Sequence, residues 1–147
     1  MQTREILRIK GNALYTVPPG ETLAAALGAL VENDIGSLVV MDHGRLIGML
    51  SFREVLRAMH EHGREAVAGT LRVADVMVRE PPQVGPDMEV EPLREFMLAK
   101  RCRYVPVMDA ATLLGVISFH DVAKAVVEEQ AFENRMLKGY IKNWPDE

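Results

Sequence analysis

Apolar residues recur along the chain with two spacings, which predict helices and strands in alternation. Positions 23, 26, 27, 30 and 31 follow the i, i+3, i+4, i+7, i+8 spacing of an amphipathic helix, expected from Glu21 to Asn33. The apolar runs 37–41 and 46–50 predict two strands, joined by a turn with a glycine where a positive φ is favoured. A short extended segment at 16–20 precedes them, and a helix from Ser51 to about His60 follows.

This order of strand, helix, strand, strand and helix occurs twice. A shift of 67 positions aligns residues 17–59 with 84–126 without a gap, and eleven of the 43 aligned pairs are identical. Eight of the identities lie within residues 40–55. Internal repetition of this kind predicts two copies of one α/β unit packed face to face, with a ligand cleft between equivalent surfaces.

The second copy predicts its own elements. They are an extended segment at 81–84, a helix from Asp87 to about Lys100, strands at 104–109 and 113–117, and a long helix from near Ser118. We expect the last helix to break or fray around Gly139, before Trp144 and Pro145.

These elements predict the domain boundaries. The first domain is expected at 8–62 and the second at 81–128, followed by a C-terminal helical extension at 129–147. A loop is expected over 61–69, and the linker at 63–80 is expected to contain a short helical turn at 71–77, with Val73, Val76 and Met77 facing inward. Because each half alone is too small to bury a large core, we expect the halves to share one core.

Composition and charge exclude several classes of protein. The 147 residues are 48% hydrophobic and 26% charged, with a net charge of −4, so nucleic-acid binding is not expected. The single cysteine, Cys102, is expected to be a buried small hydrophobe in a reducing compartment, and we expect a cytoplasmic protein. The sequence shows neither the apolar region of a signal peptide nor a membrane-spanning stretch.

The pattern Gly–x–x–Ser–x–x–acid stands at the same place in both copies. Gly48, Ser51 and Glu54 form the first, and Gly115, Ser118 and Asp121 the second. The spacing is that of a helix capping box, so a purely structural role is one interpretation of both motifs. The other interpretation is a ligand site, since a strand-to-helix junction offers free N–H groups to an anion and a carboxylate can accept bonds from a ribose diol.

The chain resembles a tandem pair of CBS (cystathionine β-synthase) domains of the stand-alone bacterial type over roughly residues 8–128. The motifs that carry the resemblance are 17–22, 35–40, 48–54, 73–79, 103–107 and 115–121. The resemblance implies an α/β (α+β) fold of two β-α-β-β-α repeats related by a pseudo-two-fold axis. It also implies a regulatory module that binds an adenosine-containing ligand between the repeats.

The resemblance implies two sets of ligand-contacting residues. The first set is Thr16, Val17, Ser37, Leu38, Ser51, Arg53 and Glu54. The second is Gln83, Val84, Tyr104, Val105, Pro106, Ser118, His120 and Asp121. Ser118 and Asp121 match the family's ribose and phosphate motif, whereas Glu54 stands where aspartate is usual. Plain core packing is the alternative for the apolar members, and a solvated first-turn position is the alternative for Arg53 and His120.

The leading hypothesis is therefore a sensor of an adenine nucleotide such as AMP, ATP or NAD(H). The alternative is a ligand-free dimerising scaffold that acts on a partner protein. An enzyme is not expected, because the sequence contains no nucleophile–base–acid set, phosphate loop or metal pattern. A homodimer is expected from the apolar residues of the final helix, and the target protein remains unnamed. These apolar residues are Val126, Val127, Phe132, Met136 and Leu137.

Overall fold

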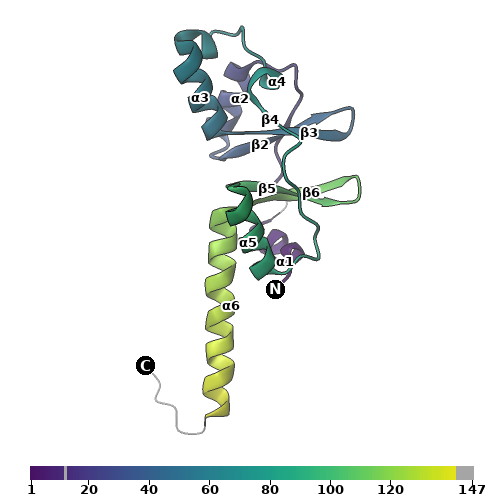
Figure 1. Cartoon of the computed structure of the whole chain (residues 1–147), viewed down its shortest axis with the longest axis vertical. Coiled ribbons are helices and arrows are strands. Elements are labelled where there is room, and N and C mark those ends of the chain that lie inside the picture. The colour runs from purple at the N-terminus through teal and green to yellow at the C-terminus, as the bar shows by residue number, and fades with distance from the viewer. Residues whose placement is uncertain (12, 142–147) are drawn as a thin grey trace. The chain divides into compact units, whose positions relative to one another are not determined.

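The computed structural model of the chain describes residues 1–11 and 13–141 (Figure 1). The chain forms two compact units. The first-repeat unit consists mainly of residues 13–83, and the second-repeat unit contains 84–109, the chain from 114 onward and the N-terminal residues. Both are mixed α/β, and each contains the element order that the sequence predicts.

The first-repeat unit is built on a four-stranded sheet in the order β1-β2-β3-β4. The strands are β1 (Thr16–Val17), β2 (Ser37–Asp42), β3 (Arg45–Ser51) and β4 (Val78–Arg79). β1 runs parallel to β2, and the other pairs are antiparallel. The hairpin turn between β2 and β3 has positive φ at His43 (49°) and at Gly44 (77°), which confirms the predicted turn.

Two helices cover one face of this sheet, α2 (Leu23–Glu32) and α3 (Phe52–His62) (Figure 1). α2 begins after Thr22, whose hydroxyl accepts a bond from Ala25 N at 3.1 Å. The linker contains the expected short helix, α4 (Val73–Val76). The loop predicted at 61–69 is wrong, because α3 runs to His62 and the 3₁₀ helix η1 (Gly63–Val67) follows with Ala66 fully buried.

The second-repeat unit repeats the arrangement with fewer strands. Val84 forms a parallel bridge to Val107, and β5 (Tyr104–Asp109) pairs with β6 (Thr112–Ser118). The helices are α5 (Val90–Lys100) and α6 (Phe119–Tyr140). The helix end predicted around Gly139 agrees with the structure, since α6 ends at Tyr140 and is capped by Ile141. Trp144 and Pro145 lie outside the described residues.

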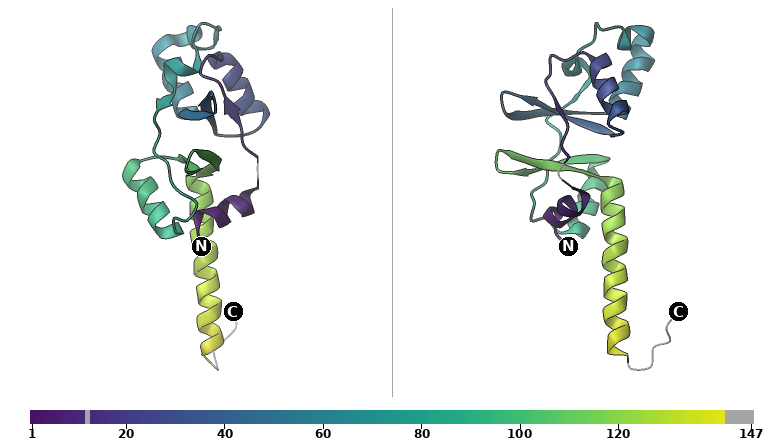
Figure 2. Two further views of the ribbon diagram at one scale, coloured as in Figure 1. Left: turned by 90° about the vertical axis from the view of Figure 1, so that its right-hand side faces the viewer. Right: turned by 180° about the vertical axis from the view of Figure 1, so that it is seen from behind.

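One helix was not predicted. α1 (Thr3–Lys10) packs within the second-repeat unit, beside the first turns of α6 (Figure 2). Thr3 N donates to Met88 O at 2.8 Å, and Ile6 lies in the buried cluster of this unit. The shift of 67 positions places α1 on residues 70–77, which contain α4. The N-terminal copy of this segment therefore packs with the second repeat, while the linker copy packs with the first.

The buried side chains form two clusters, one in each unit. The first is centred on Leu23, Leu30 and Leu50, and the second on Leu93, Val105 and Ile117. The prediction of one shared core is wrong in this respect. Cys102 is half-buried against the second cluster, where burial raises the pKa of its thiol. Within residues 1–11 and 13–141, none of the helices combines the length and apolar character that crossing a bilayer requires.

Candidate functional site

Each motif serine is the last residue of a strand and the N-cap of the helix that follows. Ser51 joins β3 to α3, and Ser118 joins β6 to α6. Both serine–acid pairs form a capping box, as the spacing predicts. The two repeats therefore present a serine and a carboxylate at equivalent helix N-termini, and they differ in the other contacts of the carboxylate.

In the first repeat the Glu54 carboxylate forms its hydrogen bonds with the helix N-cap residue. Glu54 Oε1 accepts from Ser51 N at 3.0 Å and from Ser51 Oγ at 3.0 Å, while Oε2 lies 3.2 Å from the same hydroxyl. Glu54 is only 7% exposed. Both carboxylate oxygens are thus engaged within the helix N-terminus, and no cation within the described residues forms an ion pair with this group.

In the second repeat the carboxylate is divided between two tasks. Asp121 Oδ2 accepts from Ser118 N at 2.8 Å, and Ser118 Oγ accepts from Asp121 N at 3.1 Å. Oδ2 also accepts from Lys10 Nζ at 2.7 Å, and the same ammonium donates to Val116 O at 2.9 Å. Among the residues that the structure describes, no hydrogen bond reaches Oδ1, and the Asp121 side chain is 18% exposed. One oxygen is thus free to accept from a ligand.

The surroundings of Asp121 favour its charged form. Burial raises the pKa of this carboxyl, but hydrogen bonds from Lys10 and from the Ser118 backbone, with the charge of Lys10, together outweigh it. The pKa therefore lies below its ordinary value. At neutral pH the group is a carboxylate, a hydrogen-bond acceptor suited to hydroxyl donors.

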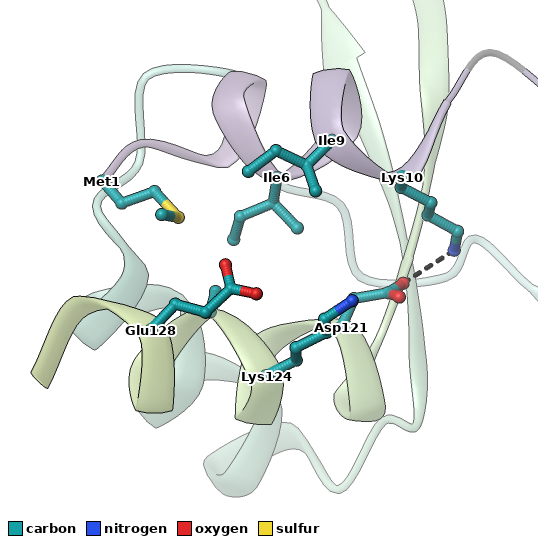
Figure 3. A pocket seen from close by; sticks show the side chains of 8 residues that line it. Met1, Ile6, Ile9, Lys10, Asp121, Lys124 and Glu128 are labelled. Atoms are coloured by element: carbon teal, nitrogen blue, oxygen red, sulfur yellow. Dashed lines mark hydrogen bonds and ion pairs between the residues drawn. The ribbon is translucent and has the colours of Figure 1, made fainter. Parts of the chain in front are cut away.

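A pocket of about 280 Å³ lies between α1 and α6, beside this carboxylate (Figure 3). Its lining combines apolar side chains with four charged ones. The lining residues are Met1, Ile6, Ile9, Lys10, Asp121, Lys124, Ala125 and Glu128. The charged groups are two ammonium and two carboxylate groups, and the ion pair between Lys10 and Asp121 lies at one end (Figure 3).

The other residues of the first set lie along β1 and β2. Ser37 is directly opposite Ser51 in the register of β2 and β3, so these two polar residues are neighbours at one end of the hairpin. Val17 and Leu38 are buried in the core cluster of the unit, whereas Thr16 and Arg53 are exposed. A ligand would therefore meet the backbone, not the side chains, of the buried pair.

The second set follows the same pattern. Val84, Val105 and Pro106 are buried, and Val84 N donates to Pro106 O at 3.1 Å. Tyr104 is half-buried, while Gln83 and His120 are exposed. The ligand roles of both sets, as opposed to their burial, stay predictions.

The residue that the sequence interpretation missed is Lys10. Lys10 is 111 positions away from Asp121 and lies outside the Gly–x–x–Ser–x–x–acid motif. A usable signal was present, because extending the 67-residue shift upstream aligns residues 3–10 with 70–77, including Thr3 with Thr70 and Ile6 with Val73. That alignment indicates a further copy of the helical segment, but not the repeat against which it packs.

Similarities to known proteins agree with this architecture. The CBS domain model matches residues 6–61 and 73–128. The chain is 30% identical over 127 residues to the mitochondrial CBS domain-containing protein CBSX3 of Arabidopsis thaliana, covering 83% of this chain and 61% of that protein. It thus spans less than two thirds of CBSX3.

Solved structures extend the likeness to the fold. A CBS-domain containing protein from Agrobacterium tumefaciens superposes with a TM-score of 0.80 at 29% identity, covering 85% of this chain and 98% of that one. CBSX2, solved in complex with AMP, superposes with a TM-score of 0.67 at 24% identity, covering 80% and 91%. With two matched segments that include both capped motifs, the chain belongs to the CBS domain family and contains two CBS domains in tandem.

Proposed function

We propose that this protein is a regulatory module that binds an adenosine-containing nucleotide at the Ser118–Asp121 motif of its second repeat. The observation that carries the proposal is the division of the Asp121 carboxylate. Oδ2 is fixed by Ser118 N and Lys10 Nζ, while Oδ1 is left as an acceptor for a ligand hydroxyl. An oriented carboxylate can accept hydrogen bonds from the hydroxyls of a ribose. The helix N-terminus beside it favours the negative charge of a phosphate attached to that ribose.

Family membership supports the class of ligand. CBSX2 was solved with AMP, and this chain shares the fold of that protein. The described groups at the motif are hydrogen-bond donors and acceptors, and the role that we propose for them is sensing. The output would then be a change in the affinity of the protein for a partner or for another copy of itself.

The proposal is tested by thermal melting of ligand-free protein with AMP, ATP, NAD, NADH, S-adenosylmethionine and GTP at millimolar concentration. A ligand at a hundredfold excess over Kd stabilises the native state by about 2.7 kcal/mol. For a protein of this size, each kcal/mol raises the melting temperature by about 2–4 °C. We expect a rise of several degrees with adenosine-containing ligands and a smaller one with GTP.

The control is the double variant Ser118→Ala, Asp121→Ala. Its own melting temperature should fall, because losing the cap costs about 1 kcal/mol. It should also lose most of the ligand-induced shift, whereas Ser51→Ala should lose a cap and keep the shift. A flat response of the unaltered protein across the whole panel would refute the proposal.

A second candidate function rests on the free part of α6. Beyond the second-repeat core this helix continues with large exposed apolar side chains, and its C-terminal half extends away from the rest of its unit (Figure 1). They are Phe132 (55% exposed), Met136 (54%), Leu137 (61%) and Tyr140 (87%). Exposed apolar surface of this kind marks an interaction site, and we assign it to a second copy of the chain. A homodimeric scaffold without ligand would use this surface alone.

A further inference from the structure

Lys10 places an ammonium group against the carboxylate of the second motif. α1 carries it there, and its Nζ atom bonds both Asp121 Oδ2 (2.7 Å) and Val116 O (2.9 Å). The Lys10 side chain remains 36% exposed. An ammonium has three donors, and two of them are accounted for by these contacts. The motif therefore offers a ligand a carboxylate and a partly solvated cation side by side, and not an acid alone.

The first repeat shows that packing does not require a cation at this position. The 67-residue shift aligns Lys10 with Met77, whose side chain packs beside Gly48. In the second repeat the contact with the motif glycine is made by Leu7, one turn earlier on α1, next to Gly115. Lys10 therefore does not pack against the motif glycine, and its side chain bonds Asp121. Its charge is particular to the second repeat.

The two ends of this ion pair suit two parts of one ligand. Asp121 Oδ1 can accept from a ribose hydroxyl without disturbing the bonds to Oδ2. The remaining donor of Lys10 can bond an anionic oxygen, and a nucleotide carries its phosphate next to the ribose. Lys124 lines the same pocket as Lys10, but among the described residues it forms no hydrogen bond to Asp121 (Figure 3). Lys10 is the lysine that bonds Asp121, the proposed acceptor for the ribose hydroxyl.

We infer that Lys10 is a specificity-determining residue that makes the second motif select phosphorylated adenosine ligands over adenosine derivatives that are neutral or cationic at the 5′ position. The inference rests on the proposed function. AMP supplies an anion that Lys10 can contact. Adenosine leaves the ammonium without a ligand partner, and the sulfonium of S-adenosylmethionine brings a positive charge toward it.

The test is calorimetric titration of AMP, adenosine and S-adenosylmethionine into the unaltered protein and into Lys10→Met, which introduces the residue that the first repeat carries. Hydrogen bonds to charged groups are about twice as strong as neutral ones. We therefore expect Lys10→Met to weaken AMP binding by about 10- to 100-fold. Adenosine should bind the variant as well as before, because its ribose hydroxyl uses Oδ1 and it carries no anion for Lys10 to contact.

Two further variants separate charge from structure. Lys10→Arg should keep the preference for AMP over adenosine, and Lys124→Met should change it little. The melting temperature of each unliganded variant reports whether α1 still packs. Equal AMP-to-adenosine affinity ratios in the unaltered protein and Lys10→Met would overturn the inference alone. An equal gain in affinity of Lys10→Met for AMP and for adenosine would also overturn it. That result would show that Lys10 competes with the ligand for Asp121. Failure of every adenosine ligand to bind the unaltered protein would refute the proposed function itself.

Discussion

The two repeats place the same capping box at the same point of the fold and use its acid differently. Glu54 is buried, and both its oxygens bond the Ser51 residue that it caps. Asp121 bonds Ser118 through Oδ2 alone and shares that atom with Lys10. The extra methylene of Glu54 lets its carboxylate fold back over the serine. The duplicated motif thus has both carboxylate oxygens bonded in one copy and, within the described residues, one oxygen without a hydrogen bond in the other.

The helices after the two motifs differ as well. α3 has 11 residues and ends before Gly63, whereas α6 has 22 and continues beyond the core of its unit. The residues that cover the motif glycines also differ, with Met77 and the Val78 carbonyl at Gly48 and Leu7 at Gly115. The same βαββα sequence pattern therefore occurs in two forms. Among the described residues, the second repeat has two features that the first lacks, the Lys10 ammonium beside its acid and a last helix that continues beyond the core.

The largest effect is expected from disrupting the exposed apolar surface on the C-terminal half of α6. Light scattering at micromolar concentration should report about twice 16.4 kDa for the unaltered protein. Phe132→Glu with Met136→Glu should halve this mass, because charges replace apolar side chains that are 55% and 54% exposed in one chain. Val31→Glu on α2, at a site 66% exposed, is the matched control and should leave the dimer intact. A monomeric unaltered protein contradicts the prediction.

The next effect concerns ligand binding by the two acids. Asp121→Ala should weaken AMP binding by about 1–3 kcal/mol, the cost of losing a hydrogen-bonded partner. Glu54→Ala should leave AMP affinity nearly unchanged while it lowers the melting temperature, because the Glu54 carboxylate serves the helix cap. Calorimetry and thermal melting on the same two variants measure both quantities. The reverse order of affinities would show that the first repeat carries the ligand.

The motif glycines should differ in their tolerance of a methyl group. A Cβ on Gly48 would lie 2.6 Å from Met77 Sδ and 2.8 Å from the Val78 carbonyl oxygen. A Cβ on Gly115 would lie 2.8 Å from Leu7 Cδ2, the end of a flexible side chain. Overpacking typically costs about 1–3 kcal/mol, and we expect Gly48→Ala near the upper end because the backbone of β4 must shift. Urea unfolding of both variants gives the comparison, and a larger loss for Gly115→Ala would contradict it.

The smallest effect is a pH dependence tied to Asp121. Its pKa is lowered from 3.8 in the folded protein, so its charged form stabilises the native state above that pH. The contribution is lost as the pH falls through the folded-state pKa. We expect the unaltered protein to exceed Asp121→Asn by at most about 1 kcal/mol at pH 7, as for a partly exposed pair. Urea unfolding at pH 7, 5 and 3.5 should show this advantage shrinking at the lowest pH, and an advantage that grows there would contradict the assignment.

Much of the fold was predictable because local pattern and internal repetition agreed. The amphipathic spacing located α2, the apolar runs located β2 and β3, and Ser51 and Ser118 marked the starts of α3 and α6. The errors arose where tertiary contacts override local preference. η1 forms in a polar stretch because Ala66 enters the core.

The sequence by itself determined the repeat, the order of elements and the two capping boxes, because each is encoded within a few consecutive residues. Only the tertiary structure decided which acid is accessible and which cation stands beside it. α1 packs with the repeat that is distant in sequence, and this brings Lys10 to Asp121 across 111 positions. No local pattern encodes such a contact. The neighbours of a polar side chain depend on where the apolar face of its helix packs, and that packing is decided by the whole fold.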